Sequence, residues 1–490
     1  MKKMSLITAF LSFCYVSTLC QPCFPEGIEF NTQAQIDSFQ INYPGCTEIE
    51  GNVLIGDFPP STINNLEGLQ VLTSIAGDLI IGGNFYLSNL SGLDNLDSIG
   101  GSLKIGYLYE GGGLGNWNLT SLTGLENLTY IGGNLWIRWN FDLLNLTGLD
   151  NVICIGEDLI ISPNEVLHSL TGLSSVTTTG GDLSISHNDS LTSLTGLENV
   201  TSIGGDLGIF GHALTSISSI NNLTSIGGSL RIGSSSLTSM LGLGNLTIVH
   251  GALRISSNYN LMNLTGLDNI TTVEGEVVIH HNNSLTSLTG LEGLHSIEEA
   301  LRIHNNNALA NLNGLNNLTT IEEGYWGMSQ ISISSNQTLI SLAGLENIEP
   351  GTFNNLQITN NYSLSTCEVK IVCEYLANNG GFAGIYDNAE GCNSPEEVQD
   401  SCEAHAGYID ISIDEDIISI YPNPATQELN ITAEGHTIEE VNIYTLTGQQ
   451  VHQESPVNGT IDISTLQPGM YIVEVMIENT RIRQKLLVQR

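Results

Sequence analysis

The sequence is poor in basic residues. Its 490 residues include 12 Lys and Arg against 51 Asp and Glu, which gives a formal net charge of −39. Proteins that bind nucleic acid or anionic membranes present a basic surface to the phosphates. We therefore expect no nucleic-acid partner, whereas a cationic partner stays open.

Long hydrophobic runs are absent beyond the N-terminus. The chain starts with Met1-Lys2-Lys3 and an apolar run from Met4 to Leu19. This run is shorter than the roughly 20 residues that span a bilayer. It has the charged and apolar parts of a secretory signal peptide, which we place at residues 1–20. We expect no transmembrane segment in the mature chain.

The recurring feature is a segment of about 24 residues with the landmark Leu-x-Gly-Leu. The second leucine of the landmark falls at Leu69, Leu93, Leu125, Leu149, Leu173, Leu197, Leu243, Leu267, Leu291, Leu315 and Leu345, and Ile220 fills the degenerate slot. Repeats of this length stack so that each coil buries its apolar face on its neighbours. We predict a mainly β, right-handed, single-stranded solenoid of about twelve coils, followed by a small β-sandwich.

The fullest form of each coil is Ile-Gly-Gly-x-Leu-x-Ile-x-x-Asn. Leu135 and Ile137 are two apart, so both point into the core and the residue between them points out. Glycine pairs such as Gly132-Gly133 suit a corner with positive φ before the strand. The asparagine that follows the strand, as at Asn140, is expected to stack with its equivalents and bond the turn backbone.

The residues of the coil resemble two related families. The Leu/Ile spacing with a following Asn is similar to a leucine-rich repeat. The whole coil resembles the receptor L domain, a right-handed solenoid of extracellular receptor regions, over residues 46–402. The resemblance implies recognition rather than catalysis. About twice the coils of one L domain are present and no kinase follows, so receptor signalling is not implied.

The C-terminal region changes character. Short alternating segments with turn residues between them predict an all-β sandwich. The region also resembles the type A C-terminal sorting domain of the type IX secretion system of Gram-negative bacteria. The resemblance rests on an ordered set of residues: Tyr421, Pro422, Asn423, Pro424, Gly448, Gly469, Tyr471 and Lys485. It implies that the secretion machinery is a partner and that the product reaches the outer-membrane surface or the extracellular space.

These observations divide the chain into six segments. After the signal peptide we expect an N-terminal cap at 21–50, whose helix lies within Phe30 to Phe39 with Asn31 or Thr32 as its N-cap. The solenoid follows at 51–366 and a cysteine-containing cap at 367–402. An acidic linker at 403–417 leads to the sorting domain at 418–490.

Six cysteines flank the repeats: Cys23, Cys46, Cys367, Cys373, Cys392 and Cys402. Outside the cytosol such cysteines form disulfides that pin the ends of a fold. We pair Cys23 with Cys46. The rear four allow three pairings, and their spacing does not fit the two close pairs of a typical zinc site. Cys154 is expected to be a free thiol.

Basic and aromatic side chains cluster on one face of the predicted sheet. Between Phe24 and Thr366 there are only five Lys and Arg residues, and four of them occupy the outward strand slot. Arg231 and Arg254 should stand side by side and repel unless an anion or local acids lie near them. The candidate ligand-binding residues on this face are Lys104, Trp136, Arg138, Trp139, Arg231, Arg254, His280, Arg302 and His304.

Three carboxylates form a second row, at Asp158, Asp182 and Asp206, each just before a strand. Oxygen ligands in register suit Ca²⁺, although solvated acids at a corner explain them as well. Otherwise we expect no cofactor.

Three functions follow from these patterns. The first is a secreted, surface-displayed, non-enzymatic binding or adhesion protein that recognises an extracellular glycan or protein; motifs such as His-Glu-x-x-His and Gly-x-Ser-x-Gly are absent. The second is a polysaccharide-degrading β-helix enzyme that uses Arg231 and Arg254. Against this alternative, the coils of Arg231 and Arg254 lack an acidic cluster, because Ser229 and Ala252 take the place of the Asp found in earlier coils. The third is a structural spacer of the cell surface.

Overall fold

The computed structural model describes residues 23–56, 61–109, 112–324, 329–378, 381–406, 418–433, 437–445, 450–455, 460–477 and 480–489. The predicted signal peptide, most of the linker and Gly448 lie outside the described residues. Contacts divide the chain into two units, Met1–Val398 and Gln399–Arg490. In the part of the chain that the structure describes, no helix has the length and apolar character to cross a membrane.

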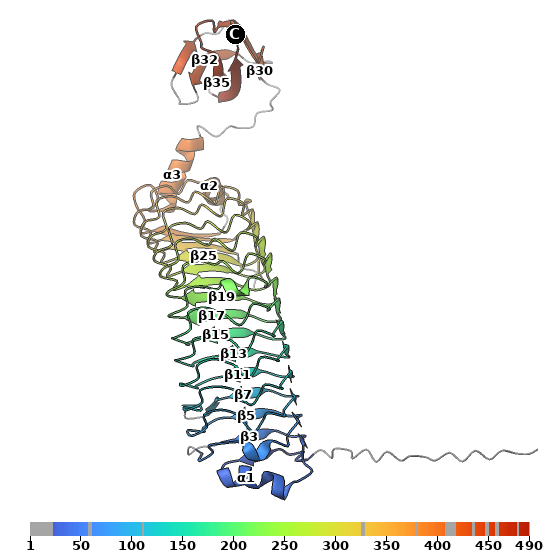
Figure 1. The fold of residues 1–490 in the computed structure, drawn as a ribbon. Coiled ribbons are helices and arrows are strands. Elements are labelled where there is room, and N and C mark those ends of the chain that lie inside the picture. The colour runs from blue at the N-terminus through green and yellow to red at the C-terminus, as the bar shows by residue number, and fades with distance from the viewer. Residues whose placement is uncertain are drawn as a thin grey trace, which may run out of the picture. The chain divides into compact units, whose positions relative to one another are not determined.

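The first unit is a parallel β-solenoid, as expected, whose strands stack in one long sheet (Figure 1). It has about fourteen turns rather than twelve, because the sheet continues at both ends into coils without the Leu-x-Gly-Leu landmark. The fifteen strands of the main sheet are β1 (Ile28–Phe30), β3 (Val53–Ile55), β5 (Leu79–Ile81), β7 (Leu103–Ile105), β11 (Leu135–Ile137), β13 (Leu159–Ile161), β15 (Leu183–Ser186), β17 (Leu207–Gly211), β19 (Leu230–Ser234), β21 (Leu253–Ser256), β23 (Val277–His280), β25 (Ala300–His304), β27 (Gln330–Ser334), β28 (Asn355–Thr359) and β29 (Phe382–Tyr386).

Most coils add a second, two-residue strand before the glycine corner, a strand that the repeat pattern did not predict. These short strands form two further parallel sheets. The first contains β2 (Glu48–Ile49), β4 (Ser74–Ile75), β6 (Ser98–Ile99), β10 (Tyr130–Ile131), β12 (Cys154–Ile155), β14 (Thr178–Thr179), β16 (Ser202–Ile203) and β18 (Ser225–Ile226). The second contains β20 (Ile248–Val249), β22 (Thr272–Val273), β24 (Ser296–Ile297) and β26 (Thr320–Ile321).

The glycine pairs at the corner have a different role from the one predicted. Neither Gly132 nor Gly133 has a positive φ; the positive φ belongs to the glycine of the landmark, such as Gly124 at +109°. A Cβ at Gly132 would lie 2.1 Å from the carbonyl oxygen of Gly100 in the preceding coil. The pair is therefore explained by close coil stacking, which leaves no room for a side chain.

The core is a continuous aliphatic column. Leu135 and Ile137 are fully buried, as is the second landmark leucine, for example Leu149. Burying one such side chain contributes roughly 1.5–3 kcal/mol. Every coil contributes the same kind of inward-facing aliphatic side chains, so the stabilisation from apolar burial is repeated with each coil.

A ladder of buried asparagines runs along the corner after the main sheet, as predicted. The Nδ2 of Asn140 donates to the carbonyl of Ile105 at 2.9 Å, and its Oδ1 accepts the backbone N–H of Asn116 at 3.2 Å. The described ladder residues are Asn84, Asn116, Asn140, Asn164 and Asn188 in a front run and Asn258, Asn282, Asn306, Asn336, Asn361 and Asn388 in a rear run. Between the runs, Ser234 takes the ladder position in its coil and donates its N–H to Asn258.

Both ends of the solenoid are capped. At the front, α1 (Gln33–Asn42) begins after Thr32 and buries Ile36 and Phe39, which confirms the expected capping helix. The Cys23–Cys46 disulfide is present, as predicted.

At the rear lie α2 (Lys370–Ala377) and the start of α3 (Pro395–Ala406), a helix that continues into the second unit after Val398. Cys367 pairs with Cys392, and Cys373 and Cys402 are disulfide-bonded as well. Cys154 is the one free cysteine among the described residues. Two short 3-10 helices, η1 (Glu67–Leu69) and η2 (Ser218–Ile220), and a hairpin of β8 (Tyr107–Tyr109) and β9 (Gly112–Leu114) complete this unit.

The second unit contains two antiparallel sheets. One is formed by β30 (Ile418–Tyr421), β31 (Glu428–Ala433) and β34 (Thr460–Asp462). The other is formed by β32 (Ile438–Thr445), β33 (Gln450–Glu454), β35 (Gly469–Ile477) and β36 (Thr480–Val488). Residues from both sheets, such as Ile431 and Val473, share one apolar cluster.

The asparagine ladder makes a first prediction. The Asn282 side chain is fully buried; its Oδ1 accepts the N–H of Asn258 at 3.1 Å and its Nδ2 donates to the carbonyl of Ile255 at 3.0 Å. We expect Asn282→Ala to lower the free energy of unfolding by about 2–3 kcal/mol, because buried backbone groups lose their partners.

Urea unfolding followed by circular dichroism measures this loss. The matched control is Asn283→Ala, because the neighbouring Asn283 side chain is exposed. Equal losses for the two variants would contradict the role of the ladder.

Candidate functional site

The outward face of the main sheet carries the predicted ligand-binding residues in two slots. The slot between the two core residues holds Lys104, Trp136, Arg231, Arg254 and Arg302, and Arg231 pairs directly with Arg254 in the strand register. The slot after the second core residue holds Arg138, His280 and His304. Trp139 lies one residue further on, at the corner.

Local carboxylates neutralise most of these cations. The Nζ of Lys104 lies 2.8 Å from Asp78 and the Nη1 of Arg231 lies 2.7 Å from Asp206. Both cations thus reach back to an acid in the preceding coil. Burial raises the pKa of Asp78, but the hydrogen bonds from Lys104 and from the Ser102 backbone outweigh it and hold the pKa below its usual value.

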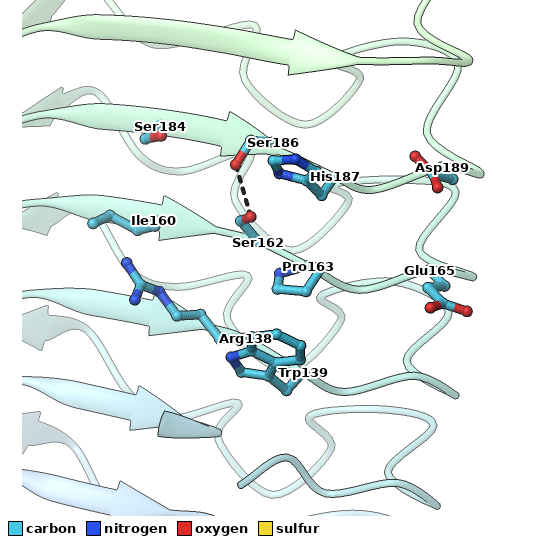
Figure 2. A pocket seen from close by; sticks show the side chains of 10 residues that line it. All are labelled: Arg138, Trp139, Ile160, Ser162, Pro163, Glu165, Ser184, Ser186, His187 and Asp189. Carbon is cyan, nitrogen blue, oxygen red and sulfur yellow. Dashed lines mark hydrogen bonds between the residues drawn. The ribbon is translucent and has the colours of Figure 1, made fainter. Parts of the chain in front are cut away.

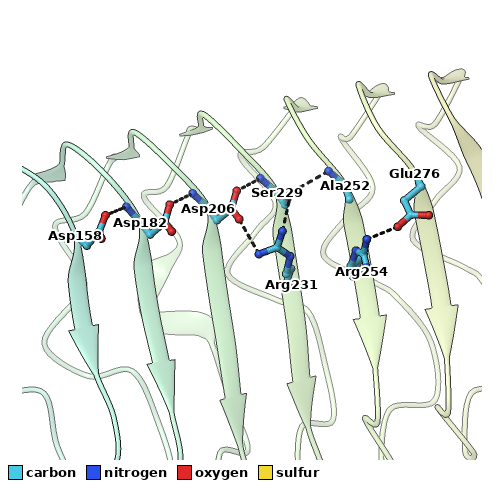
Figure 3. A network of polar contacts seen from close by, with 8 residues as sticks. All are labelled: Asp158, Asp182, Asp206, Ser229, Arg231, Ala252, Arg254 and Glu276. Atoms are coloured by element: carbon cyan, nitrogen blue, oxygen red, sulfur yellow. Dashed lines mark hydrogen bonds and ion pairs between the residues drawn. The ribbon is translucent and has the colours of Figure 1, made fainter. Parts of the chain in front are cut away.

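Glu276 binds two arginines at once. Its carboxylate accepts from Arg254 and, at 2.6 Å, from Arg302, and its side chain is only 10% exposed. Arg231 and Arg254 therefore lean apart, toward Asp206 and Glu276 (Figure 3). As expected, the coils of Arg231 and Arg254 carry Ser229 and Ala252 in place of Asp. The acids that bind these arginines come from neighbouring coils, where Glu276 takes the position that Asp holds in the earlier coils.

The predicted row of aspartates is part of a backbone ladder (Figure 3). The Oδ1 of Asp158 accepts the N–H of Asp182 at 2.8 Å, and the Oδ1 of Asp182 accepts that of Asp206 at 2.7 Å. The Oδ1 of Asp206 likewise accepts the N–H of Ser229. One oxygen of each carboxylate thus satisfies the corner of the next coil, which accounts for the row without a cation. Calcium binding here stays a prediction.

Arg138 differs from the other basic residues on this face. Among the described residues it forms no ion pair, and its buried Nε has no hydrogen-bond partner. Its guanidinium lies 4.7 Å from the centre of the Trp136 ring, and Lys104 lies 5.2 Å from the same ring. Partial burial lowers the pKa of Arg138.

Arg138 and Trp139 line a hollow of about 590 Å³ on the solenoid surface (Figure 2). The other lining residues come from the next two coils and are Ile160, Ser162, Pro163, Glu165, Ser184, Ser186, His187 and Asp189. Figure 2 shows Arg138 and Trp139 on one side, His187 and the bonded pair Ser162–Ser186 across from them, and Glu165 and Asp189 at the outer edge. Repeat periodicity alone did not reveal this hollow.

An aromatic run leads up to the hollow. Phe85 stacks on Trp117 at 4.3 Å between ring centres, and Phe141 contacts both Trp117 and Trp139 edge to face. Trp117 is 49% exposed. The run ends at Trp139, which is a wall of the hollow.

The residues before the ladder asparagines show a common backbone feature. Trp139, His187 and His281 have φ of 61°, 54° and 56°, a left-handed conformation that bulky residues seldom adopt. Asn305 and Asn360 take the same position in other coils with φ of 58° and 59°. The signal that could have located Trp139, His187 and His281 is therefore the position just before each ladder asparagine.

The predicted residues His280 and His304 contact each other, and the ring of His281 contacts both of them. The His280 and His304 rings stack at 4.8 Å, and the Nδ1 atoms of His280 and His281 lie 2.8 Å apart. Burial, the neighbouring His304 and His281, and Arg254 lower the pKa of His280 to about 4. Burial, His281 and Arg302 also lower the pKa of His304.

The predicted sorting motif ties the two ends of the second unit together. Asn423 donates from Nδ2 to the carbonyl of Lys485 at 2.7 Å, and its Oδ1 accepts the N–H of Leu487 at 2.9 Å. Tyr471 is buried and its hydroxyl donates to the carbonyl of Gln467. Tyr421 is half-exposed. The Tyr-Pro-Asn-Pro segment thus holds the last strand through hydrogen bonds from the Asn423 side chain to the backbone of that strand.

Comparison with protein families finds a match within each unit. Residues 419–489 match the secretion system C-terminal sorting domain, and residues 201–290 and 271–376 match the receptor L domain. The solenoid is therefore similar to the receptor L domain over residues 201–376, and the second unit matches the sorting domain over residues 419–489. The resemblance to the sorting domain is confirmed, and the resemblance to the receptor L domain is confirmed for residues 201–376 of the predicted 46–402. No curated protein matches this chain.

The sorting domain indicates secretion by the type IX system to the cell surface or the extracellular space, and with it an interaction with the secretion machinery. The receptor L domain suggests a binding role.

The position of Glu276 generates a prediction about stability. We expect Glu276→Gln to lower the free energy of unfolding by about 1–2 kcal/mol, because hydrogen bonds to a charge weaken while the partly exposed arginines remain screened by solvent. Urea unfolding measures the difference. The control is Glu274→Gln, whose exposed carboxylate pairs only with His250 among the described residues. No loss in Glu276→Gln would contradict the bridging role.

The contacts of Asn423 generate a prediction about secretion. We expect Asn423→Ala to destabilise the sorting domain by about 1–2 kcal/mol, through the loss of two hydrogen bonds to the last strand. The secreted fraction should fall, as measured by immunoblots of culture medium and cell fractions. Gln427→Ala, at an exposed position in the same unit, serves as the control and should be secreted normally.

Proposed function

We propose that the secreted solenoid is a non-enzymatic binding protein that recognises an extracellular glycan in the hollow beside Trp139. The observation that carries the proposal is the pair Arg138 and Trp139. Of the basic residues predicted to bind a ligand, Lys104, Arg231, Arg254 and Arg302 are engaged by acids of the solenoid. Arg138 keeps its guanidinium unpaired at the edge of the hollow, among the described residues.

The lining of the hollow has the chemistry that a sugar needs. The aliphatic C–H face of a sugar ring packs on an indole, and Trp139 supplies such a surface. Hydroxyl groups of a sugar require convergent donors and acceptors, which Arg138, Ser184, Glu165 and Asp189 supply. Arg138 also suits a carboxylate-bearing sugar, because its guanidinium can bind a carboxylate through two parallel hydrogen bonds.

The surface next to the hollow supports a ligand longer than one sugar. The aromatic run from Phe85 through Trp117 and Phe141 reaches Trp139, and Trp117 is open to solvent. Coils stack about 4.8 Å apart, a spacing close to the length of one sugar unit in a chain. A polysaccharide lying along the solenoid can therefore contact several coils, as adhesion to a glycan-coated surface requires.

Two competing functions make different predictions. A polysaccharide-degrading enzyme would release shortened products from a bound chain. A structural spacer would bind no glycan, with or without the hollow. Arg231 and Arg254, the residues assigned to the enzymatic alternative, are each held by a carboxylate, which favours a structural role for them.

The test compares glycan-array binding of the purified secreted protein with that of the double variant Arg138→Ser/Trp139→Asn. Ser and Asn occupy the equivalent positions of other coils, at Ser186 and Asn305, so the variant is expected to fold. The matched control is Arg231→Ser, for which Ser184 is the precedent. We expect the double variant to bind at least about 10-fold more weakly, because an aromatic and arginine pair dominates such contacts, while the control retains its affinity.

Each other outcome contradicts part of the proposal. An equal loss of glycan affinity in Arg231→Ser would place the binding site at the arginines that pair with acids. Shortened glycan products in the reaction mixture would favour the enzyme. Absence of glycan binding by the wild-type protein would discard the glycan and favour a protein ligand or a spacer.

A further inference from the structure

Three histidines from two neighbouring coils face one another on the rear half of the main sheet. His280 and His304 are register partners on β23 and β25, and His281 follows His280 at the corner. One ring nitrogen from each of the three lies within 4.8 Å of the others, and no other such group of three His, Cys, Asp or Glu occurs among the described residues.

We propose that His280, His281 and His304 form a binding site for a late first-row divalent cation, with Zn²⁺ as the expected occupant. The proposal is independent of the glycan hollow, because the hollow lies on coils of β11 to β15 and the histidines lie on coils of β23 and β25.

The ligand set selects the class of metal. Neutral imidazoles suit Zn²⁺, Cu²⁺ and Ni²⁺, whereas Ca²⁺ and Mg²⁺ require oxygen ligands. Zn–N bonds of about 2.0–2.1 Å in a tetrahedron separate ligand nitrogens by roughly 3.4 Å. Nitrogens now within 4.8 Å reach that separation by rotation of the rings about their side-chain torsions. Three histidines leave a fourth position for water or a ligand group.

The solenoid itself shows that histidine is not needed to build these positions. Ser256 and Ser334 take the slot of His280 and His304 in the adjoining coils. At the corner, Asn305 adopts the same left-handed backbone as His281, and asparagine accepts that conformation more readily than histidine does. Packing alone therefore does not account for three imidazoles at one point.

The immediate neighbourhood can hold the ligands in place. Asn305 Nδ2 lies 3.2 Å from the Nδ1 of His304. A flip of that amide presents its oxygen to Nδ1–H, which orients the ring so that Nε2 can bind the metal.

The charges nearby permit a cation. Arg254 and Arg302 lie in the adjacent slot, and both bind Glu276, which reduces their repulsion toward the site. The net charge of −39 on the chain raises the local concentration of cations.

The test is a Zn²⁺ titration of the purified secreted protein in competition with a chromogenic chelator. The variants His281→Asn and His304→Ser use residues that the neighbouring coils carry at the same positions. The control His168→Ser changes an exposed histidine on a distant coil. Circular dichroism and metal-free thermal unfolding check that all variants fold.

We expect one Zn²⁺ per chain, at least about 10-fold weaker binding in His281→Asn and in His304→Ser, and unchanged binding in His168→Ser. Zn²⁺ should also raise the unfolding temperature of the wild-type protein and of the control but not that of the double variant His281→Asn/His304→Ser. Excess Ca²⁺ should not displace the bound Zn²⁺.

Two results would overturn the site. One is the absence of Zn²⁺ binding by the folded wild-type protein. The other is Zn²⁺ binding that the double variant His281→Asn/His304→Ser retains in full, which would place the metal elsewhere.

Discussion

The buried asparagine ladder is the interaction on which the rest of the solenoid depends. From Asn116 onward each amide accepts a backbone N–H and donates to a backbone carbonyl of the preceding coil, as Asn164 does with Asn140 and Ile137. These contacts hold the corner where the main sheet ends, and a corner without them would bury unpaired peptide groups. The same corner displays Trp139, His187 and His281, so the surface available for binding is set by the ladder beneath it.

The acidic side chains beside the sheet face form a second ladder, in which a carboxylate of one coil accepts a backbone N–H of the next coil. Asp206 shows how one side chain serves both purposes, since one oxygen accepts the N–H of Ser229 and the other binds Arg231. Most cations on this face are thereby neutralised by acids of the solenoid, and the proposed binding sites lie at the few positions where this pattern stops. Arg138 and the three histidines are such positions.

Repetition is why much of the fold could be predicted from sequence. Leu135 and Ile137 recur with neighbours of the same kind in coil after coil, so their inward direction and the stacking of Asn140 follow from spacing alone. The front disulfide also followed, since Cys23 and Cys46 flank the first coils. Glu276 and the hollow did not follow, because they depend on side chains that reach between coils. His281 was missed because it lies at a corner, outside the strand slots that periodicity defines.

The interruption of the asparagine ladder at Ser234 has a consequence for the mechanics of the molecule. At the same place the first sheet of short strands ends at β18 and the second begins at β20. A stacked array behaves as a one-dimensional chain of nearest-neighbour couplings, so its weakest junction divides it into cooperative blocks. The main sheet runs through this place without a break, so the solenoid stays one unit, and a pulling force on the chain is expected to open it first at this seam.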